Sequence, residues 1–310
     1  MLDRRELIKL SGAAALLSFM PSSFAHAAAT SKVPFRFCLN TSTISGQQPG
    51  LLKYIDIASM AGYDGIELWT NDIKDYLSKG NSLQSLAAFI KSKNIEVYNA
   101  ISFTTWMVED GTTRKAGMAA LEDEMKMMSA LGCHRIAAPP AGVERGEVIN
   151  IEHIAGYYKD ILQLGRKYKV MPLLEFWGAS GTLSNFSQAL AIAAATNDAD
   201  ARLLPDVFHL FRGGSGFNCL QLVNGKVIDI MHMNDYPDKP VDRQTDSDRV
   251  YPGDGIAPLK QILHSLKTIG VTKILSLELF NETYWKQDAL KVAITGLQKM
   301  KGLVNDVINA

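Results

Sequence analysis

Short apolar segments alternate eight times with longer amphipathic segments from Ser31 onward. The apolar segments have the length and composition of buried strands, and the amphipathic segments follow the helical period. This alternation predicts a parallel sheet, because parallel strands need long crossover connections, usually helices, between them. Eight such units, with no linker rich in Pro, Gly or Ser, favour an α/β fold with a single closed (β/α)8 TIM barrel over an open doubly wound sheet.

The predicted strands cover 35–40, 65–69, 96–100, 135–138, 170–176, 202–207, 227–232 and 273–279. The predicted helices cover 51–61, 82–93, 114–131, 151–168, 183–196, 258–269 and 288–307, with a shorter segment near 217–223. No Gly-x-Gly-x-x-Gly motif follows the first strand, and the glycine-rich run at 213–216 lacks the lysine of a nucleotide loop. We therefore expect no nucleotide site.

The segment 1–27 is predicted to be an export signal rather than part of the barrel. A twin-arginine pair stands at 4–5, an apolar run covers 12–20, and 25–27 reads Ala-His-Ala, a cleavage pattern. The apolar run is shorter than the roughly 20 residues that a membrane span needs. We therefore expect export by the twin-arginine (Tat) route to the periplasm, cleavage of this signal peptide, and a barrel over 28–310 without a membrane span.

Charge and cysteine content limit the classes of partner. The formal net charge is zero, which gives no electrostatic footprint for nucleic acid or for a membrane surface. Three cysteines, Cys38, Cys133 and Cys219, are widely spaced and odd in number, so no disulfide framework is predicted. Cys38 and Cys133 are expected to be small buried residues. No nucleic-acid partner is expected, and a homo-oligomer is left open.

Four side chains of metal-binding type stand where consecutive predicted strands end. Glu175, Asp206, His232 and Glu278 follow the apolar runs of strands five to eight. In a barrel these positions share the carboxyl-end face, where barrel enzymes carry their active sites. A lone acid at a strand end is usually a helix cap or a solvated group, but four on consecutive strands can converge. Three carboxylates and one imidazole suit a divalent cation; we expect Mn²⁺, with Mg²⁺, Co²⁺ or Zn²⁺ as alternatives.

Nearly the whole of the chain after the leader resembles the xylose isomerase-like TIM barrels, often called sugar phosphate isomerases/epimerases. The resemblance rests on the segments GYDGIEL at 62–68, LE at 174–175, PDVFH at 205–209, HMND at 232–235, PGDG at 252–255 and LE at 277–278. It implies a metal-dependent enzyme of carbohydrate metabolism whose partner is a small carbohydrate.

The resemblance also implies roles for individual residues. The implied metal ligands are Glu175, Asp206, His232 and Glu278, and the two glutamates would also act as the acid/base pair, as in the ketose 3-epimerase branch. His209 and Arg249 match positions that contact substrate oxygens in that branch. The branch also has a substrate-binding glutamate shortly after the first metal glutamate, and 176–181 contains none.

The expected chemistry is proton transfer next to a carbonyl group. A hydroxy-ketone can chelate a divalent cation, which stabilises the enediolate formed when the α-proton leaves. Glu175 and Glu278 can then remove and return the proton on the two faces of the substrate. Return to the same carbon gives an epimer, and return to the neighbouring carbon gives an aldose–ketose isomer. Loss of a β-substituent instead gives a dehydratase or a 3-keto-glycoside lyase, so these alternatives remain open.

Four further residues are candidate substrate contacts. His209 follows a ligand strand closely and is either a donor to the substrate or a group that holds Asp206. Arg249 is either a substrate contact or a surface charge. Trp69 and Trp177 follow strands two and five and are either barrel packing or walls for a sugar ring. A metal-dependent hydrolase and a non-catalytic sugar-binding barrel stay open, whereas six histidines and no excess charge disfavour an endonuclease.

Overall fold

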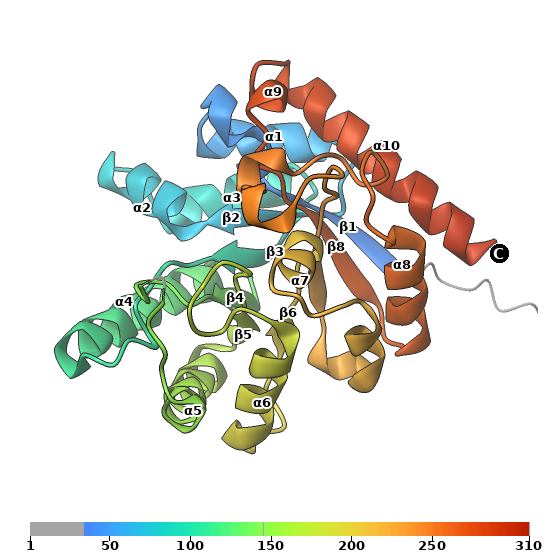
Figure 1. The fold of residues 1–310 in the computed structure, drawn as a ribbon. Coiled ribbons are helices and arrows are strands. Elements are labelled where there is room, and N and C mark those ends of the chain that lie inside the picture. The colour runs from blue at the N-terminus through green and yellow to red at the C-terminus, as the bar shows by residue number, and fades with distance from the viewer. Residues whose placement is uncertain (1–33, 145, 310) are drawn as a thin grey trace, which may run out of the picture. The chain divides into compact units, whose positions relative to one another are not determined.

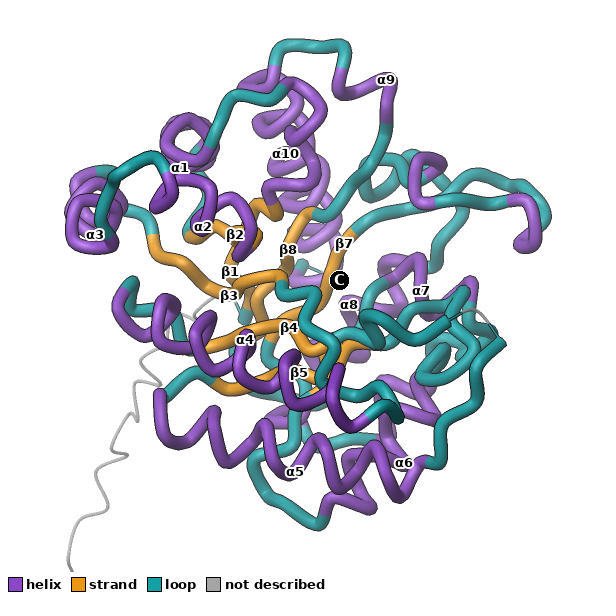
Figure 2. Tube along the Cα trace, turned by 90° about the vertical axis from the view of Figure 1, so that its left-hand side faces the viewer, coloured by secondary structure: helices purple, strands orange, loops and turns teal. Residues whose placement is uncertain are grey.

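The computed structural model describes residues 34–144 and 146–309. The predicted leader over 1–27 lies outside these residues. Within the described part, strands and helices alternate along the chain (Figure 1). Figure 2 shows the strands at the centre, with helices around them. The predicted (β/α)8 barrel is therefore confirmed.

All strand pairs of the barrel are parallel. The strands are β1 (Phe35–Asn40), β2 (Gly65–Trp69), β3 (Glu96–Ile101), β4 (Arg135–Ala138), β5 (Met171–Glu175), β6 (Leu203–Leu204), β7 (Ile230–Met233) and β8 (Lys273–Leu277). Hydrogen bonds join them in the orders β3-β2-β1-β8-β7 and β4-β5-β6. Parallel bridges from Leu203 to Ile228 and from Asp206 to His232 connect β6 to β7, and β3 lies beside β4. These contacts bring the ends of β5 to β8 together.

The helices surround the strands as the crossovers of the barrel. They are α1 (Leu51–Ala61), α2 (Thr70–Ser78), α3 (Leu83–Ser92), α4 (Gly111–Ala130), α5 (Ile151–Tyr168), α6 (Phe186–Thr196), α7 (Val207–Arg212), α8 (Leu259–Thr268), α9 (Glu282–Trp285) and α10 (Ala289–Ile308). Among the described residues, no helix is both long and apolar enough to cross a membrane.

The core has two layers. One lies between the strands and the surrounding helices and holds most of the large apolar side chains. The other fills the inside of the barrel with small and branched side chains, which come from Cys38, Ile101, Ala137, Leu173, Leu204, Ile230 and Ile274. Because this inner layer is closely filled, the barrel is a packed core rather than a pore, and a ligand can be bound only at its rim.

The element bounds agree with the sequence prediction in most places and differ around β6. The predicted strand over 202–207 is reduced to Leu203–Leu204. Pro205 has no N–H for a ladder, and Asp206 already caps α7 by accepting a hydrogen bond from the backbone N–H of His209 at 2.7 Å. The segment near 217–223 forms a 3₁₀ turn, and α2, α7 and α9 were not predicted. Cys38 and Cys133 are buried and free, as expected.

Candidate metal-binding active site

The four predicted ligands lie on neighbouring strands at the carboxyl-end face of the barrel. Glu175 is the last residue of β5, and Asp206 is the N-cap of α7, directly after the β6 segment. His232 lies within β7, and Glu278 directly follows β8. None of the four residues is more than 5% exposed. The fold therefore places all four charges away from bulk water.

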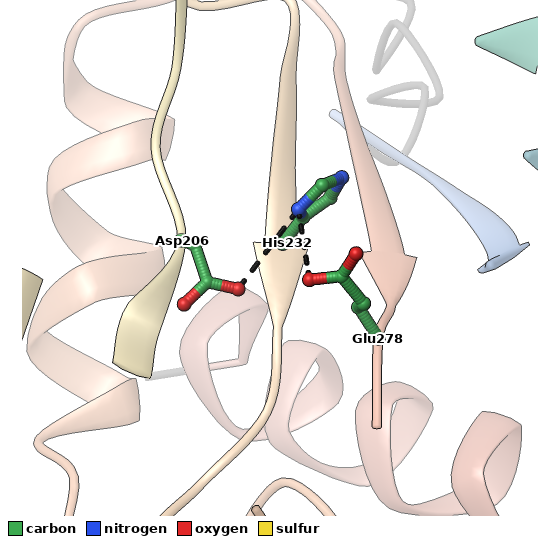
Figure 3. A group of neighbouring side chains, drawn as sticks. All are labelled: Asp206, His232 and Glu278. Atoms are coloured by element: carbon green, nitrogen blue, oxygen red, sulfur yellow. Dashed lines mark ion pairs between the residues drawn. The ribbon is translucent and has the colours of Figure 1, made fainter. Parts of the chain in front are cut away.

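Three of these side chains converge closely, and the fourth lies beside them. One ligand atom from each of Asp206, His232 and Glu278 lies within 4.8 Å of the others. Figure 3 shows these three side chains pointing toward one another. Nδ1 of His232 is 3.1 Å from Oε2 of Glu278 and 3.9 Å from Oδ2 of Asp206. Its distance to Oε1 of Glu175 is 4.0 Å. The structure therefore groups three ligand atoms at the spacing of a metal site, with Glu175 beside His232.

The orientation of His232 is fixed by a carboxylate that the sequence analysis did not select. Nε2 of His232 lies 3.1 Å from Oε1 of the buried Glu67. Burial favours the neutral form of Glu67, but His232 and hydrogen bonds from Ser276 and Asn99 outweigh it, so the pKa of Glu67 is lowered. An ionised carboxylate can only accept, so Nε2 carries the hydrogen and Nδ1 faces the cluster.

The free ring nitrogen of His232 provides the test of whether these residues fit a metal. Nδ1 is buried, has no hydrogen-bond partner and is surrounded by three carboxylates. Burial lowers the pKa of His232, but the charges of Glu278 and Glu67 raise it well above its usual range. The carboxylates that favour a proton on this nitrogen also attract a metal ion. A proton and a cation therefore compete for Nδ1. The donor set fits a divalent cation.

Glu67 is held by a complete set of donors. Its carboxylate accepts hydrogen bonds from Nδ2 of Asn40 at 2.9 Å, Nδ2 of Asn99 at 2.6 Å and Oγ of Ser276 at 2.7 Å. These donors come from β1, β3 and β8, and Glu67 itself lies in the middle of β2. The sequence offered one signal for this residue, namely a charged side chain inside an otherwise apolar strand, which needs buried partners.

Arg249 is a buried member of the site rather than a surface charge. Its Nη1 donates to Oδ2 of Asp206 at 3.0 Å and to Oε2 of Glu278 at 2.8 Å. Its Nη2 donates to Oδ1 of Asp246 at 2.7 Å. Burial favours the neutral guanidine, but these carboxylates outweigh it and raise the pKa of Arg249. The guanidinium therefore offers a permanent positive charge beside the candidate metal ligands.

The long loop after β7 places Arg249 at the rim of the barrel. The buried carboxylate of Asp235 accepts hydrogen bonds from the backbone N–H groups of Gly253, Gly255 and Ala257, at 2.8 to 3.1 Å. An antiparallel bridge also joins Asp235 to Val250. These contacts fold the loop back over the barrel, so that its charged sequence forms one wall of the site.

The two candidate acid/base groups have different environments. Burial raises the pKa of Glu175 to about 8; His232 opposes this shift, and the charges of Glu278, Glu67 and Asp206 add to it. Burial also raises the pKa of Glu278, but His232 and Arg249 outweigh it and lower the pKa overall. The two carboxyl groups are thus driven toward opposite protonation states.

His209 lies beside the arginine as a neutral imidazole. Its side chain is 8% exposed, with Nε2 at 3.2 Å from Nη2 of Arg249 and Nδ1 at 3.3 Å from the backbone N–H of Gly178. Asp206 favours the protonated form, but burial and Arg249 outweigh it and lower the pKa of His209. The predicted position next to the site is found, and its role in substrate binding stays a prediction.

A cavity of 370 Å³ opens directly above these groups. It is lined by the residues Trp69, Ile101, Phe103, Val143, Glu175, Trp177, Ala179, Ser180, His209, Arg212, Asp246, Arg249, Glu278 and Phe280. All four predicted substrate contacts and both candidate acid/base glutamates are therefore in its wall. Asp206 and His232 lie deeper, below the cavity.

Comparison with known proteins agrees with this architecture. A family model described as xylose isomerase-like TIM barrel matches residues 55–302. An inosose isomerase of Bacillus velezensis is 30% identical over 277 residues, which cover 87% of this chain and 97% of the relative. The structure of the IolI protein with a bound zinc atom has a TM-score of 0.80 and 28% identity, and the match covers 88% of this chain and 99% of that one.

A structure of an L-ribulose 3-epimerase has the same fold, with a TM-score of 0.71 and 18% identity over 88% of this chain and 96% of that one. The chain belongs to the xylose isomerase-like TIM barrel family. Its similarity to the inosose isomerases makes it an enzyme of the isomerase class.

Proposed function

We propose that the protein is a divalent-metal-dependent isomerase or epimerase that acts on a ketose or a keto-sugar. The observation that carries the proposal is the position of two glutamates in the wall of one cavity, next to the unpartnered Nδ1 of His232. The relatives named inosose isomerases support it, because an inosose is a cyclic polyhydroxy ketone. Mn²⁺ is the proposed ion, and the zinc in the similar structure supports a divalent metal.

Glu175, Asp206, His232 and Glu278 would hold the cation. When bound, a divalent cation supplies a Lewis acid that stabilises an enediolate. Glu175 ends β5 and Glu278 follows β8, with β6 and β7 between them, which suits bases on the two faces of a flat substrate. One glutamate removes the α-proton and the other returns a proton, which inverts the configuration.

The neighbouring side chains would orient the substrate. Arg249 holds Glu278 at 2.8 Å, which keeps that carboxylate ionised and aimed at the cavity. The same guanidinium lines the cavity, and its Nε, which has no hydrogen-bond partner among the described residues, can donate to a substrate hydroxyl or carbonyl oxygen. The imidazole of His209 lies beside it and accepts from Nη2 of Arg249 through Nε2, which helps to hold the guanidinium in place.

Proton exchange in heavy water tests this function most directly. The Mn²⁺-loaded protein would be mixed with ketoses, inososes and 3-keto-glycosides in D₂O and followed by NMR. We expect deuterium next to the ketone of at least one compound, a new epimer or isomer, and loss of the new product in Glu278→Gln. Hydrolysis without deuterium exchange would identify a hydrolase. An unsaturated product would identify a lyase or dehydratase. Binding without exchange would identify a sugar-binding barrel; each of these results would overturn the proposal.

We also propose that the protein is exported to the periplasm by the twin-arginine route and that 1–27 is its cleaved leader. The support is the sequence pattern at 4–5, 12–20 and 25–27. The double variant Arg4→Lys, Arg5→Lys keeps the charge but not the guanidinium pair, and should leave uncut protein in the cytoplasm. Normal cleavage and secretion of this variant in a cell-fractionation assay would contradict the twin-arginine route.

A further inference from the structure

Four aromatic rings form a continuous wall along one side of the cavity. They belong to Phe280, Trp69, Phe103 and Trp177, which we call the aromatic arc. The centroid of Trp69 is 6.2 Å from that of Phe280 and 5.1 Å from that of Phe103, which in turn is 6.2 Å from that of Trp177. The four residues follow or end β8, β2, β3 and β5. Four rings at these spacings make a wall longer than one sugar ring.

The rings of the arc are not buried as core aromatics are. Phe103 is 38% exposed, and the other three are only partly buried. By contrast, Phe176 and Phe186 form an edge-to-face pair with at most 1% of either side chain exposed. Rings that serve only to pack the barrel would be covered like this pair. The arc instead keeps apolar surface open toward the cavity.

One ring of the arc, that of Trp69, is connected by hydrogen bonds to the candidate acid/base site. Nε1 of Trp69 donates to Oδ1 of Asn40 at 3.1 Å. Nδ2 of the same Asn40 donates to Oε1 of Glu278 at 3.0 Å. The indole N–H is thereby already paired, so this part of the wall offers ring faces and no hydrogen bonds to a ligand.

The cavity is therefore divided chemically. The charged and polar lining groups gather after β5 to β8, whereas Ile101 and Val143 continue the apolar side with the arc. A keto-sugar carries hydroxyl groups around its ring, and each needs a polar partner when it loses water. The keto ring therefore fits the charged side, where Arg249 and the glutamates stand. A volume of 370 Å³ lies toward the lower end of the range of roughly 300–1,000 Å³ found for pockets that hold drug-sized ligands.

We propose that the substrate is a two-ring compound: a glycoside whose keto ring reacts at the charged side while its second ring stacks on the aromatic arc. The assignment of the keto ring rests on the proposed function. The second ring is recognised by an apolar face, which either a sugar or a phenolic aglycone provides. The segment 176–181, which follows the first candidate metal glutamate, contains Trp177 and no carboxylate. An aromatic ring at this position favours stacking over hydrogen bonding.

The test compares kcat/KM of the Mn²⁺-loaded protein for a single-ring keto-sugar, its phenyl glycoside and a disaccharide with the same keto ring. An aromatic contact of about 0.5–1.5 kcal/mol corresponds to a factor of roughly 2 to 12, so we expect at least one two-ring compound to be preferred about tenfold. Phe103→Ala should lower this preference by about the same factor, and Phe103→Leu should lower it less. Preference for the phenyl compound or for the disaccharide tells which second ring is native.

The matched control is Phe89→Ala on α3, a partly buried phenylalanine that does not line the cavity; it should leave the preference unchanged. Circular dichroism checks that each variant is folded. Equal or better turnover of the single-ring compound by the wild-type protein would overturn the inference. So would an equal loss on all compounds in Phe103→Ala.

A binding measurement separates this inference from the proposed function. Quenching of tryptophan fluorescence by the corresponding non-keto glycosides reports stacking without turnover. Tighter binding of the two-ring compounds, weakened in Phe103→Ala, would support the arc even if no proton exchange were found. Proton exchange without any preference for a second ring would keep the proposed function and end this inference.

Discussion

The two sides of the cavity differ in the burial of their side chains and in the partners that hold them. The charged side, after β5 to β8, consists of groups that hold one another, and no candidate ligand on it is more than 5% exposed. The aromatic arc makes few hydrogen bonds and leaves Phe103 38% exposed. Fixed charges out of water require partners, whereas ring faces need only contact. The charged side is therefore suited to the chemical step, and the arc to the choice of substrate.

This difference predicts effects of different size and kind. A change on the charged side removes one member of a coupled network and leaves the others without a partner, so its effect on rate or metal affinity is large. A change in the arc removes contact area, so its effect falls on discrimination between substrates and is small.

The largest expected effect is on the chemical step. Glu175→Gln and Glu278→Gln keep the size of the side chain but remove the basic carboxylate, so each should lower kcat by roughly 10² to 10⁴-fold. If the reaction is an epimerisation, one variant should still exchange the α-proton of one epimer, and the other variant that of the opposite epimer. NMR in D₂O measures both. Near-normal turnover by either metal-loaded variant would contradict the two-base assignment.

The next largest expected effect is a loss of metal affinity in a variant that keeps all four candidate ligands. Glu67→Gln keeps a polar group beside Nε2 of His232 but removes the charge that fixes the ring. Partners of this kind typically contribute about 10 to 100-fold to metal affinity, so a chelator competition titration should show a loss of that size. Glu122→Gln, which changes a carboxylate paired with Lys167 away from the site, is the control. Unchanged affinity in Glu67→Gln would mean that His232 is oriented by the strand alone.

The sequence predicted the barrel and the ligand positions because both depend on local pattern. Apolar runs identify strands, and parallel strands bring the residues that follow them to one face. The role of Glu67 could not be predicted in this way, since its partners His232 and Ser276 lie 165 and 209 residues away. The burial of Arg249 likewise depends on how the long loop after β7 folds back over the barrel. The hydrophobic period of the sequence gives no information on the path of a loop.

The short elements near the rim were missed for a related reason. Helix α7 begins at a residue that already served as a candidate ligand, because the carboxylate of Asp206 both caps the helix and faces the site. Its six residues are too few to display a helical period. The sequence predicted Trp69 and Trp177 as separate candidate substrate contacts, and only the three-dimensional structure shows that Phe103 connects them.

The smallest expected effect lies where the two sides of the cavity meet. Trp69→Phe keeps an aromatic ring but removes the N–H that holds Oδ1 of Asn40. A single neutral hydrogen bond is worth about 0.5–1.5 kcal/mol, so KM should rise by a factor of roughly 2 to 12, with little change in kcat. Steady-state kinetics would show this. A large fall in kcat with unchanged KM would indicate that Asn40 and Trp69 belong functionally to the charged side.

Metal content measured on matched variants tests the central account most directly. After loading with Mn²⁺ and desalting, elemental analysis of the wild-type protein should give one ion per chain. Asp206→Ala and His232→Ala should lose most of it while circular dichroism still reports the barrel, since both residues lie at the carboxyl-end face and outside the apolar core. Phe103→Ala, in the aromatic arc, should keep full occupancy. Full occupancy in both Asp206→Ala and His232→Ala would contradict the account.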